Sequence, residues 1–129
     1  QGYKTYFLQN DDGQMKETHS VAAGLDYIGV SPILASLRAA EKVRFEATTD
    51  QEVLDAFSLT LEKEGLIPAL ESSHAFAQVF KETKDLGKDD IILINLSGRG
   101  DKDIFTVADA FSDPHWNKFI QKKAEEYGA

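Results

Sequence analysis

The sequence contains no cysteine, and this absence excludes two classes of site. Without thiols the chain has neither a disulfide framework nor a thiolate metal centre, and a cysteine-free composition fits a reducing compartment, so we expect a cytoplasmic protein. No run of apolar residues approaches the roughly 18 that a membrane span requires, so we predict no transmembrane helix. Residues 1–4 have neither an apolar signal core nor an initiator Met, which predicts that the chain starts within a longer sequence.

Basic residues are also scarce. Lys and Arg number 14 against 22 Asp and Glu, which gives a formal net charge of −8. Because an acidic surface repels phosphate groups, we predict no nucleic-acid partner and no binding to an anionic membrane. The 129 residues, 42% hydrophobic and 28% charged, are typical of one globular domain over 1–129. A domain of this length is expected to bury roughly two thirds of the surface of its unfolded chain.

Short apolar segments alternate with amphipathic ones along the chain. The apolar run 91–94 predicts a strand that is buried on both faces, as parallel strands usually are. We also predict strands over 43–48 and 66–70, and a strand-turn-strand unit over 3–20 around an Asp-Gly turn. Helical periodicity predicts helices near 32–40, 50–64, 73–80 and 104–107, and a terminal helical tail within 111–129. This alternation favours an α/β fold, a three-layer sandwich with a mainly parallel sheet.

The helix ends carry their own signals. Ser31 before Pro32, Thr49, and Ser72 or Ser73 are the predicted N-caps, and Gly65 is the predicted C-terminal stop. In the last helix, which starts at Ser112-Asp113-Pro114, we expect Trp116, Phe119 and Ile120 to face inward.

A glycine loop follows the predicted strand 91–94 and makes the first candidate site. Gly98 and Gly100 allow a ligand to approach the backbone closely, and Asn95 and Ser97 add polar side chains at the carboxyl end of a strand. Ser97 lacks the Gly-x-Ser-x-Gly frame of an acyl-transfer nucleophile, so a hydrogen bond to a ligand suits it better. A plain strand-to-loop turn with solvated charges remains the alternative.

A second polar cluster follows the predicted strand 66–70. Glu71 is either a first-turn helix charge or a site carboxylate with a shifted pKa, and His74 is better explained as a hydrogen-bonded helix residue. Asp26, in a loop between two glycines, either caps a turn or pairs with an arginine. No His, Asp and Glu spacing predicts a metal site. If the two predicted strands are parallel neighbours, Glu71 and Ser97 meet at one edge of the sheet.

Two long motifs, LIPALESSHA at 66–75 and NLSGRGDKD at 95–103, closely resemble segments of tryptophan synthase β chains. The segments QNDDGQ at 9–14, AGLDY at 23–27 and TTDQE at 48–52 resemble the same family, in the same order and with similar spacing. The resemblance covers residues 2 to about 110, and 111–129 resemble the family less. It implies the carboxyl-terminal part of a fold-type II enzyme that uses pyridoxal 5'-phosphate.

The resemblance also implies an activity for the whole enzyme and roles for individual residues. The enzyme replaces the hydroxyl of L-serine with indole to give L-tryptophan, and acts as a homodimer with a tryptophan synthase α chain. Ser97 would bond the pyridine nitrogen of the cofactor, with Gly98 and Gly24 beside it. Glu71 would assist loss of the serine hydroxyl and hold indole, and Asp26 would pair with an arginine of a mobile lid and with serine.

The resemblance further places backbone carbonyls near Tyr27 and Gly29 around a monovalent cation. Here the sequence departs from the family pattern, because Ile28 and Ser31 stand where the family usually has Pro and Gly. The His-Lys pair that carries the cofactor-binding lysine and the glycine-rich phosphate loop are absent from these 129 residues. We therefore predict that this chain alone is inactive. Two alternatives remain, a non-catalytic binding module on the same scaffold and an adhesive module that uses Arg99-Gly100-Asp101.

Overall fold

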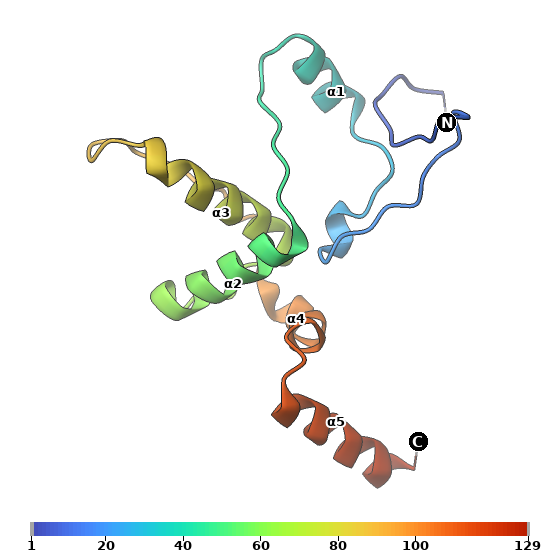
Figure 1. The fold of residues 1–129 in the computed structure, drawn as a ribbon, viewed down its shortest axis with the longest axis vertical. Helices are drawn as coiled ribbons and strands as arrows, with labels where there is room; N and C mark the ends of the chain where they lie inside the picture. Colours follow the sequence, from blue (N-terminus) through green and yellow to red (C-terminus); the bar gives the residue numbers. More distant parts are fainter. Residues whose placement is uncertain (1, 129) are drawn as a thin grey trace.

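Helices make up the regular structure of residues 2–128, the part of the chain that this computed structural model describes (Figure 1). The α-helices are α1 (Pro32–Ala39), α2 (Asp50–Glu64), α3 (Leu70–Glu82), α4 (Ile104–Ala110) and α5 (Pro114–Tyr127). Three short 3-10 helices, η1 (Ala23–Leu25), η2 (Thr83–Asp85) and η3 (Gly100–Asp103), lie between them. Across residues 2–128 there is no β-strand, only isolated antiparallel bridges.

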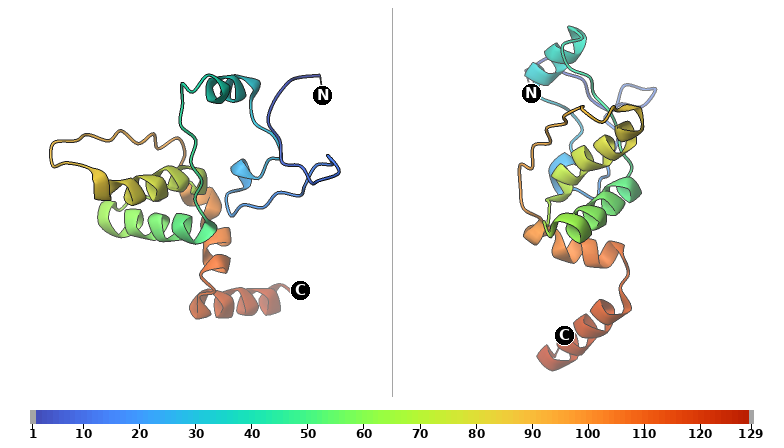
Figure 2. Two further views of the ribbon diagram at one scale, coloured as in Figure 1. Left: turned by 45° about the horizontal axis from the view of Figure 1, so that its top comes forward. Right: turned by 90° about the vertical axis from the view of Figure 1, so that its left-hand side faces the viewer.

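The core lies where α2 and α3 pack side by side, with α4 against them (Figures 1 and 2). Its buried residues are Ala22, Val53, Leu54, Ala56, Phe57, Leu70, Ala77 and Val107. The first turns of α2 and α3 both contact the segment 21–24, because Val21 N–H donates to Asp50 and Gly24 N–H donates to Glu71. The core therefore centres on the amino-terminal ends of the two longest internal helices.

Local capping chemistry fixes most helix ends as the sequence predicts. Ser31 caps α1 ahead of Pro32, and Asp113 caps α5. Thr49 forms a capping box with Glu52 at the start of α2, and Gly65 ends that helix in the left-handed region at φ 66°. These signals depend on residues within one turn of each other, so the sequence alone reveals them.

Helix α3 is different, and the predicted capping by Ser72 or Ser73 is wrong. The helix begins at Leu70, its N-cap Ala69 offers no side-chain hydrogen bond, and Ser73 Oγ instead donates to the Ala69 carbonyl. The carboxylate of Asp103 takes the capping role from 33 residues away, since its Oδ2 accepts from Leu70 N–H at 3.0 Å. The segment that joins α2 to α3 after Gly65 is therefore short and comprises only residues 66–69.

The predicted strands are segments outside the helices that form isolated bridges at most, in the part of the chain that the structure describes. Ile91 and Leu93 are each 95% exposed and Ile92 is 41% exposed, so the prediction of a strand buried on both faces is wrong for 91–94. A strand forms only when a neighbour satisfies its backbone N–H and C=O groups. Within residues 2–128 no segment lies beside 91–94 to do this, so the sheet of the predicted three-layer sandwich is not formed here.

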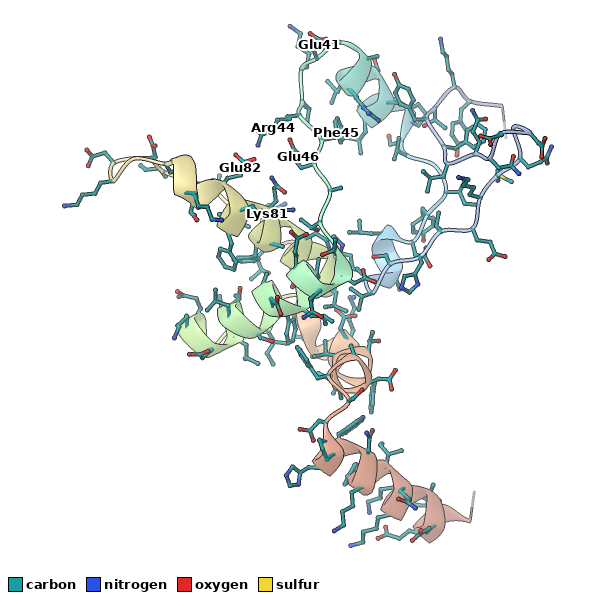
Figure 3. All side chains as sticks on the ribbon, viewed as in Figure 1. Glu41, Arg44, Phe45, Glu46, Lys81 and Glu82 are labelled. Atoms are coloured by element: carbon teal, nitrogen blue, oxygen red, sulfur yellow. The ribbon has the colours of Figure 1, made fainter. Side chains whose placement is uncertain are left out.

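The segment 43–48 runs at an angle to α3, and charged side chains connect the two (Figure 3). Arg44 forms ion pairs with Glu82 of α3 and with Glu46 on its own segment. Lys81 Nζ donates to the Ala47 carbonyl at 3.0 Å. These contacts position the segment without the ladder hydrogen bonds that would make it a strand.

The amino-terminal strand-turn-strand prediction is met only in outline. A tight turn over Asn10–Gly13 brings Gln9 opposite Met15 in one antiparallel bridge, and Phe7 pairs with Gly29 in another. No longer ladder follows from either bridge in the described part of the chain.

The chain is open in shape, and α5 stands away from the core (Figure 2). It exposes 10168 Å², where a compact protein of its mass would expose about 6,800 Å² and its unfolded chain about 20,700 Å². The expected burial of two thirds is therefore wrong, and about half is buried. Phe119 and Ile120 of α5, predicted to face inward, are 49% and 43% exposed. Of the helices described, none has the length and apolar character to cross a membrane.

Candidate functional site

The first turn of α3 is the place where the predicted site residues converge. Glu71, the second residue of that helix, extends its carboxylate between two other segments. Its Oε1 accepts from Gly24 N–H of η1 at 2.8 Å, and its Oε2 accepts from Lys102 Nζ of η3 at 2.9 Å. Stretches of sequence 47 residues before Glu71 and 31 residues after it thus meet at its side chain.

Lys102 also binds the neighbouring carboxylate. Its Nζ lies 2.6 Å from Asp103 Oδ1, and the other oxygen of Asp103 accepts from Leu70 N–H at 3.0 Å. Asp103 is 8% exposed, so this carboxylate is buried with a cation and a helix N–H as its partners. A buried carboxylate is tolerated when it is paired and hydrogen-bonded in this way.

These contacts shift the protonation of both partners. Partial burial raises the pKa of Glu71, but the hydrogen bond from Lys102 and backbone N–H groups, including that of Gly24, outweigh it, so the pKa lies below its usual value. Burial lowers the pKa of Lys102, but its bonds to Asp103 and Glu71 outweigh burial, so that pKa is raised. Near neutral pH Glu71 is therefore a carboxylate and Lys102 an ammonium.

Ser97 and Gly98 lie beside the same helix turn. Ser97 Oγ is 3.2 Å from Ser72 Oγ, and the Gly98 carbonyl accepts from Ala69 N–H at 3.0 Å. A bridge between Pro68 and Arg99 continues this contact, so the glycine loop runs antiparallel to 66–69. The two polar clusters therefore lie together, although an antiparallel bridge joins them instead of the parallel strands predicted.

A hollow of about 510 Å³ opens next to Ser97. It is lined by Gly65, Leu66, Ile67, Leu96, Ser97, Gly98, Arg99 and Asp101. Arg99 and Asp101 face each other at its edge with two hydrogen bonds of 2.8 Å. The two charged groups of the tripeptide Arg99-Gly100-Asp101 thus bind each other, while Gly100 is buried against Pro68.

Asp26, Tyr27 and Gly29 line a different hollow, of about 670 Å³, between the amino-terminal segment and the loop after η1. Asp26 follows η1 directly, so it is only two residues from the Gly24 N–H that binds Glu71. Gly29 pairs with Phe7, and the Ile28 carbonyl accepts from Leu8 N–H. The predicted site residues therefore form one cluster of Glu71, Gly24, Ser97 and Gly98, and a separate group around Asp26.

Lys102 and Asp103 lie within the motif at 95–103, but the sequence alone assigned them no role. Nothing local marks Asp103 as buried, because the N–H that it binds is 33 residues away. His74, by contrast, lies one turn into α3 with Nδ1 2.8 Å from the Leu70 carbonyl, as a hydrogen-bonded helix residue would. Within residues 2–128 no three His, Asp or Glu side chains gather closely enough to hold a metal ion.

No family model matches this chain, but several curated proteins are similar to it. The chain is similar to the tryptophan synthase beta chain of Helicobacter hepaticus, with 50% identity over 128 residues, 99% of this chain. It is 54% identical over 106 residues to that of Allorhizobium ampelinum and 52% identical over 109 residues to that of a Jannaschia species, 82% and 84% of this chain.

These matches cover only part of each relative, namely 30%, 26% and 27% of their lengths. The match to the Helicobacter hepaticus protein includes α5, since it leaves out only one residue of the chain. Identity of 50% or more over at least 106 residues, with both long motifs inside, confirms the predicted resemblance. The chain belongs to the tryptophan synthase beta chain family, of which it matches the carboxyl-terminal portion.

Proposed function

We propose that this chain forms part of the active site of an enzyme that uses pyridoxal phosphate to replace the hydroxyl of L-serine with indole, giving L-tryptophan. The observation that carries the proposal is the convergence of Glu71, Gly24 and Ser97 on the first turn of α3. Polar groups from distant stretches of sequence that converge beside a hollow are the arrangement that an active site requires.

The residues present fit the pyridine end of the cofactor. Ser97 has a neutral hydroxyl at the edge of the 510 Å³ hollow. It is hydrogen-bonded to the Ser72 hydroxyl and can exchange this partner for a ring nitrogen. When bound, pyridoxal phosphate supplies an electron sink for chemistry at the amino acid. A hydroxyl does not force protonation of the ring nitrogen as a carboxylate would, so Ser97 favours replacement at Cβ over competing carbanion reactions.

Glu71 acts in this proposal as an ionised, hydrogen-bond-accepting group. Because its pKa is lowered, it suits binding of the indole N–H better than donation of a proton to the leaving hydroxyl. Asp26 uses its backbone N–H to bind the Ala23 carbonyl, and its carboxylate lines the second hollow, where it would meet an arginine of a lid and serine. The carbonyls near Tyr27 and Gly29, at the second hollow, would hold a monovalent cation.

The rest of the proposed protein completes the fold. The curated relatives are more than three times as long as the matched region, and parallel strands need neighbours that residues 2–128 do not provide. We propose that the extended segments 43–48, 66–69 and 91–96 become strands of the predicted three-layer sandwich when the remaining length is present. The same assembly would be a cytoplasmic homodimer that binds a tryptophan synthase α chain.

The test compares two proteins with L-serine, indole and pyridoxal phosphate. The full-length protein should form tryptophan, measured by chromatography, and the 129-residue chain should form none, because it has no His-Lys pair to hold the cofactor. A full-length protein that forms no tryptophan would overturn the proposal and favour a non-catalytic binding module.

Replacing Ser97 with Asp tests its assigned contact. The new carboxylate should hold a proton on the ring nitrogen and strengthen the electron sink, so the full-length S97D enzyme should lose tryptophan synthesis and gain side reactions such as racemisation of serine. Chiral chromatography of residual serine measures the change. The S97A variant should lose synthesis without that gain, and equal racemisation by both variants would count against the assignment.

The exposed apolar faces predict self-association of the 129-residue chain. Ile91 and Leu93 are almost fully exposed, and uncovered apolar patches of this kind drive association. Size-exclusion chromatography with light scattering should find dimers or larger species, and the double variant I91K/L93K should shift the distribution toward monomer. A wild-type chain that stays monomeric at high concentration would contradict this.

A further inference from the structure

We propose that Lys102 is a positioning residue that holds the Glu71 carboxylate in one orientation, through a closed set of contacts that starts and ends on the first turn of α3. The inference rests on the proposed function, because it concerns how Glu71 meets its substrate. It adds Lys102 and Asp103 to the residues on which the site depends.

The two oxygens of Glu71 are bound by groups from two different elements. Oε1 is bound by the Gly24 N–H of η1 and Oε2 by the Lys102 ammonium of η3. Rotation of the carboxylate would break one of these bonds, so the two together define the direction of its remaining lone pairs. A single bond would leave that rotation free, which is why Lys102 matters for orientation as well as charge.

Lys102 is itself held in place. A lysine side chain is long and flexible, and an exposed ion pair alone fixes it poorly. Here Asp103 Oδ1 binds Nζ at 2.6 Å, and Asp103 is buried with its other oxygen on Leu70 N–H. Because Leu70 and Glu71 are consecutive, the contacts close into a ring of Leu70 N–H, Asp103, Lys102 and Glu71.

Among the charged groups around Glu71, Lys102 is a cation that contacts its carboxylate directly. From η1 the contact is a backbone N–H, and the acid that directly follows that helix is Asp26. From α3 itself His74 turns its ring to the Leu70 carbonyl, and from η3 Asp103 shares Lys102. Arg99 pairs with Asp101 at 2.8 Å. The lowered pKa of Glu71 agrees with this arrangement.

The test uses the full-length protein and three variants. K102M removes the charge at similar side-chain length, K102R keeps a cationic donor, and K81M is the matched control. Lys81 likewise binds a carboxylate, that of Glu52, and a backbone carbonyl, but it lies at the other end of α3 (Figure 3). If K102M fails to fold, D103N replaces it, since the amide oxygen can still accept from Leu70 N–H while the charge that holds Lys102 is lost.

The first readout needs no activity. In protein without cofactor and labelled with ¹³C at glutamate carboxyls, the Glu71 signal, assigned by its loss in E71Q, should titrate at higher pH in K102M than in wild type or K81M. The sign follows from the structure, because Lys102 stabilises the carboxylate and its removal favours the protonated acid. Equal titration in K102M and wild type would overturn the proposal.

The second readout is the pH profile of the loaded enzyme. K102M should lose about tenfold or more in kcat, with the acid limb moved to higher pH, because Glu71 is protonated sooner and less well oriented. K102R should recover part of the loss, and K81M should match wild type. A uniform loss at every pH, or no recovery in K102R, would mean that Lys102 serves only stability. If neither the wild-type protein nor any variant forms tryptophan, the proposed function is wrong. The titration of Glu71 still decides the role of Lys102 in that case.

Discussion

Gly100→Ala is expected to be the most damaging single substitution to the structure of this region. A Cβ at this position would lie 2.2 Å from the Pro68 carbonyl oxygen and 2.9 Å from its carbonyl carbon, and backbone atoms cannot move away as a flexible side chain can. Separation of the two segments would also weaken the bonds of Gly100 N–H to Ile67 and of Ala69 N–H to Gly98. Overpacking and the loss of two hydrogen bonds together predict a cost of about 3 kcal/mol or more.

Urea unfolding of the full-length protein measures this cost, and hydrogen exchange over 66–70 and 96–103 should locate it. Gly87→Ala is the matched control, because its Cβ would meet only the Asp90 carboxylate at an ordinary 3.4 Å. Gly87→Ala should change stability by less than about 1 kcal/mol. A G100A protein as stable as G87A, with unchanged exchange in both segments, would show that the close approach of 98–100 to 67–69 is absent in the assembled protein.

The helices were predictable because their signals are local. Ser31, Thr49 and Asp113 cap helices through N–H groups two or three residues away, and Gly65 stops α2 by adopting a positive φ. Each of these interactions lies within about one helical turn of sequence. The start of α3 was mispredicted because its cap comes from Asp103, and no local pattern connects that carboxylate to Leu70.

The strands could be recognised as apolar segments, but their burial could not be predicted. A strand is completed by another strand, and for 91–94 no such neighbour lies in residues 2–128. The exposures still keep a period of two, since Ile91 and Leu93 are 95% exposed while Ile92 is 41% exposed and Ile94 is half-buried. This alternation indicates that one face of the segment lies toward the chain and the other lacks a covering layer.

The candidate site was predictable where it depended on the two long motifs and not where it depended on side-chain contacts. Pattern and resemblance together named Glu71, Gly24, Ser97 and Gly98, which the structure brings to the start of α3. Lys102 was missed because a lysine between two aspartates reads as a solvated charge. Its role depends on a carboxylate 31 residues away, a distance in sequence that motif reasoning does not bridge.

Gly24→Ala should have the largest effect on catalysis with the least effect on folding. A Cβ on Gly24 would lie 2.5 Å from Glu71 Oε1 and 2.9 Å from its Cγ, so the Glu71 side chain must move. Gly24 lies in η1 without a positive φ, so alanine fits its backbone and the helix can remain. Because a displacement of about 1 Å can cost about 100-fold in rate, the full-length G24A enzyme should lose about 100-fold in kcat with its urea midpoint nearly unchanged.

The double variant G24A/E71D distinguishes displacement of the Glu71 carboxylate from a general loss of structure around Gly24. Aspartate is one methylene shorter, so it withdraws from the new Cβ, and its carboxylate can again lie between residue 24 and Lys102. The double variant should therefore be more active than G24A alone, although E71D by itself should be less active than wild type. If the activity losses of G24A and E71D instead multiply in the double variant, Gly24 does not act through Glu71. The convergence on the first turn of α3 is then not the basis of the site. A positive coupling between positions 24 and 71 is what a shared carboxylate requires.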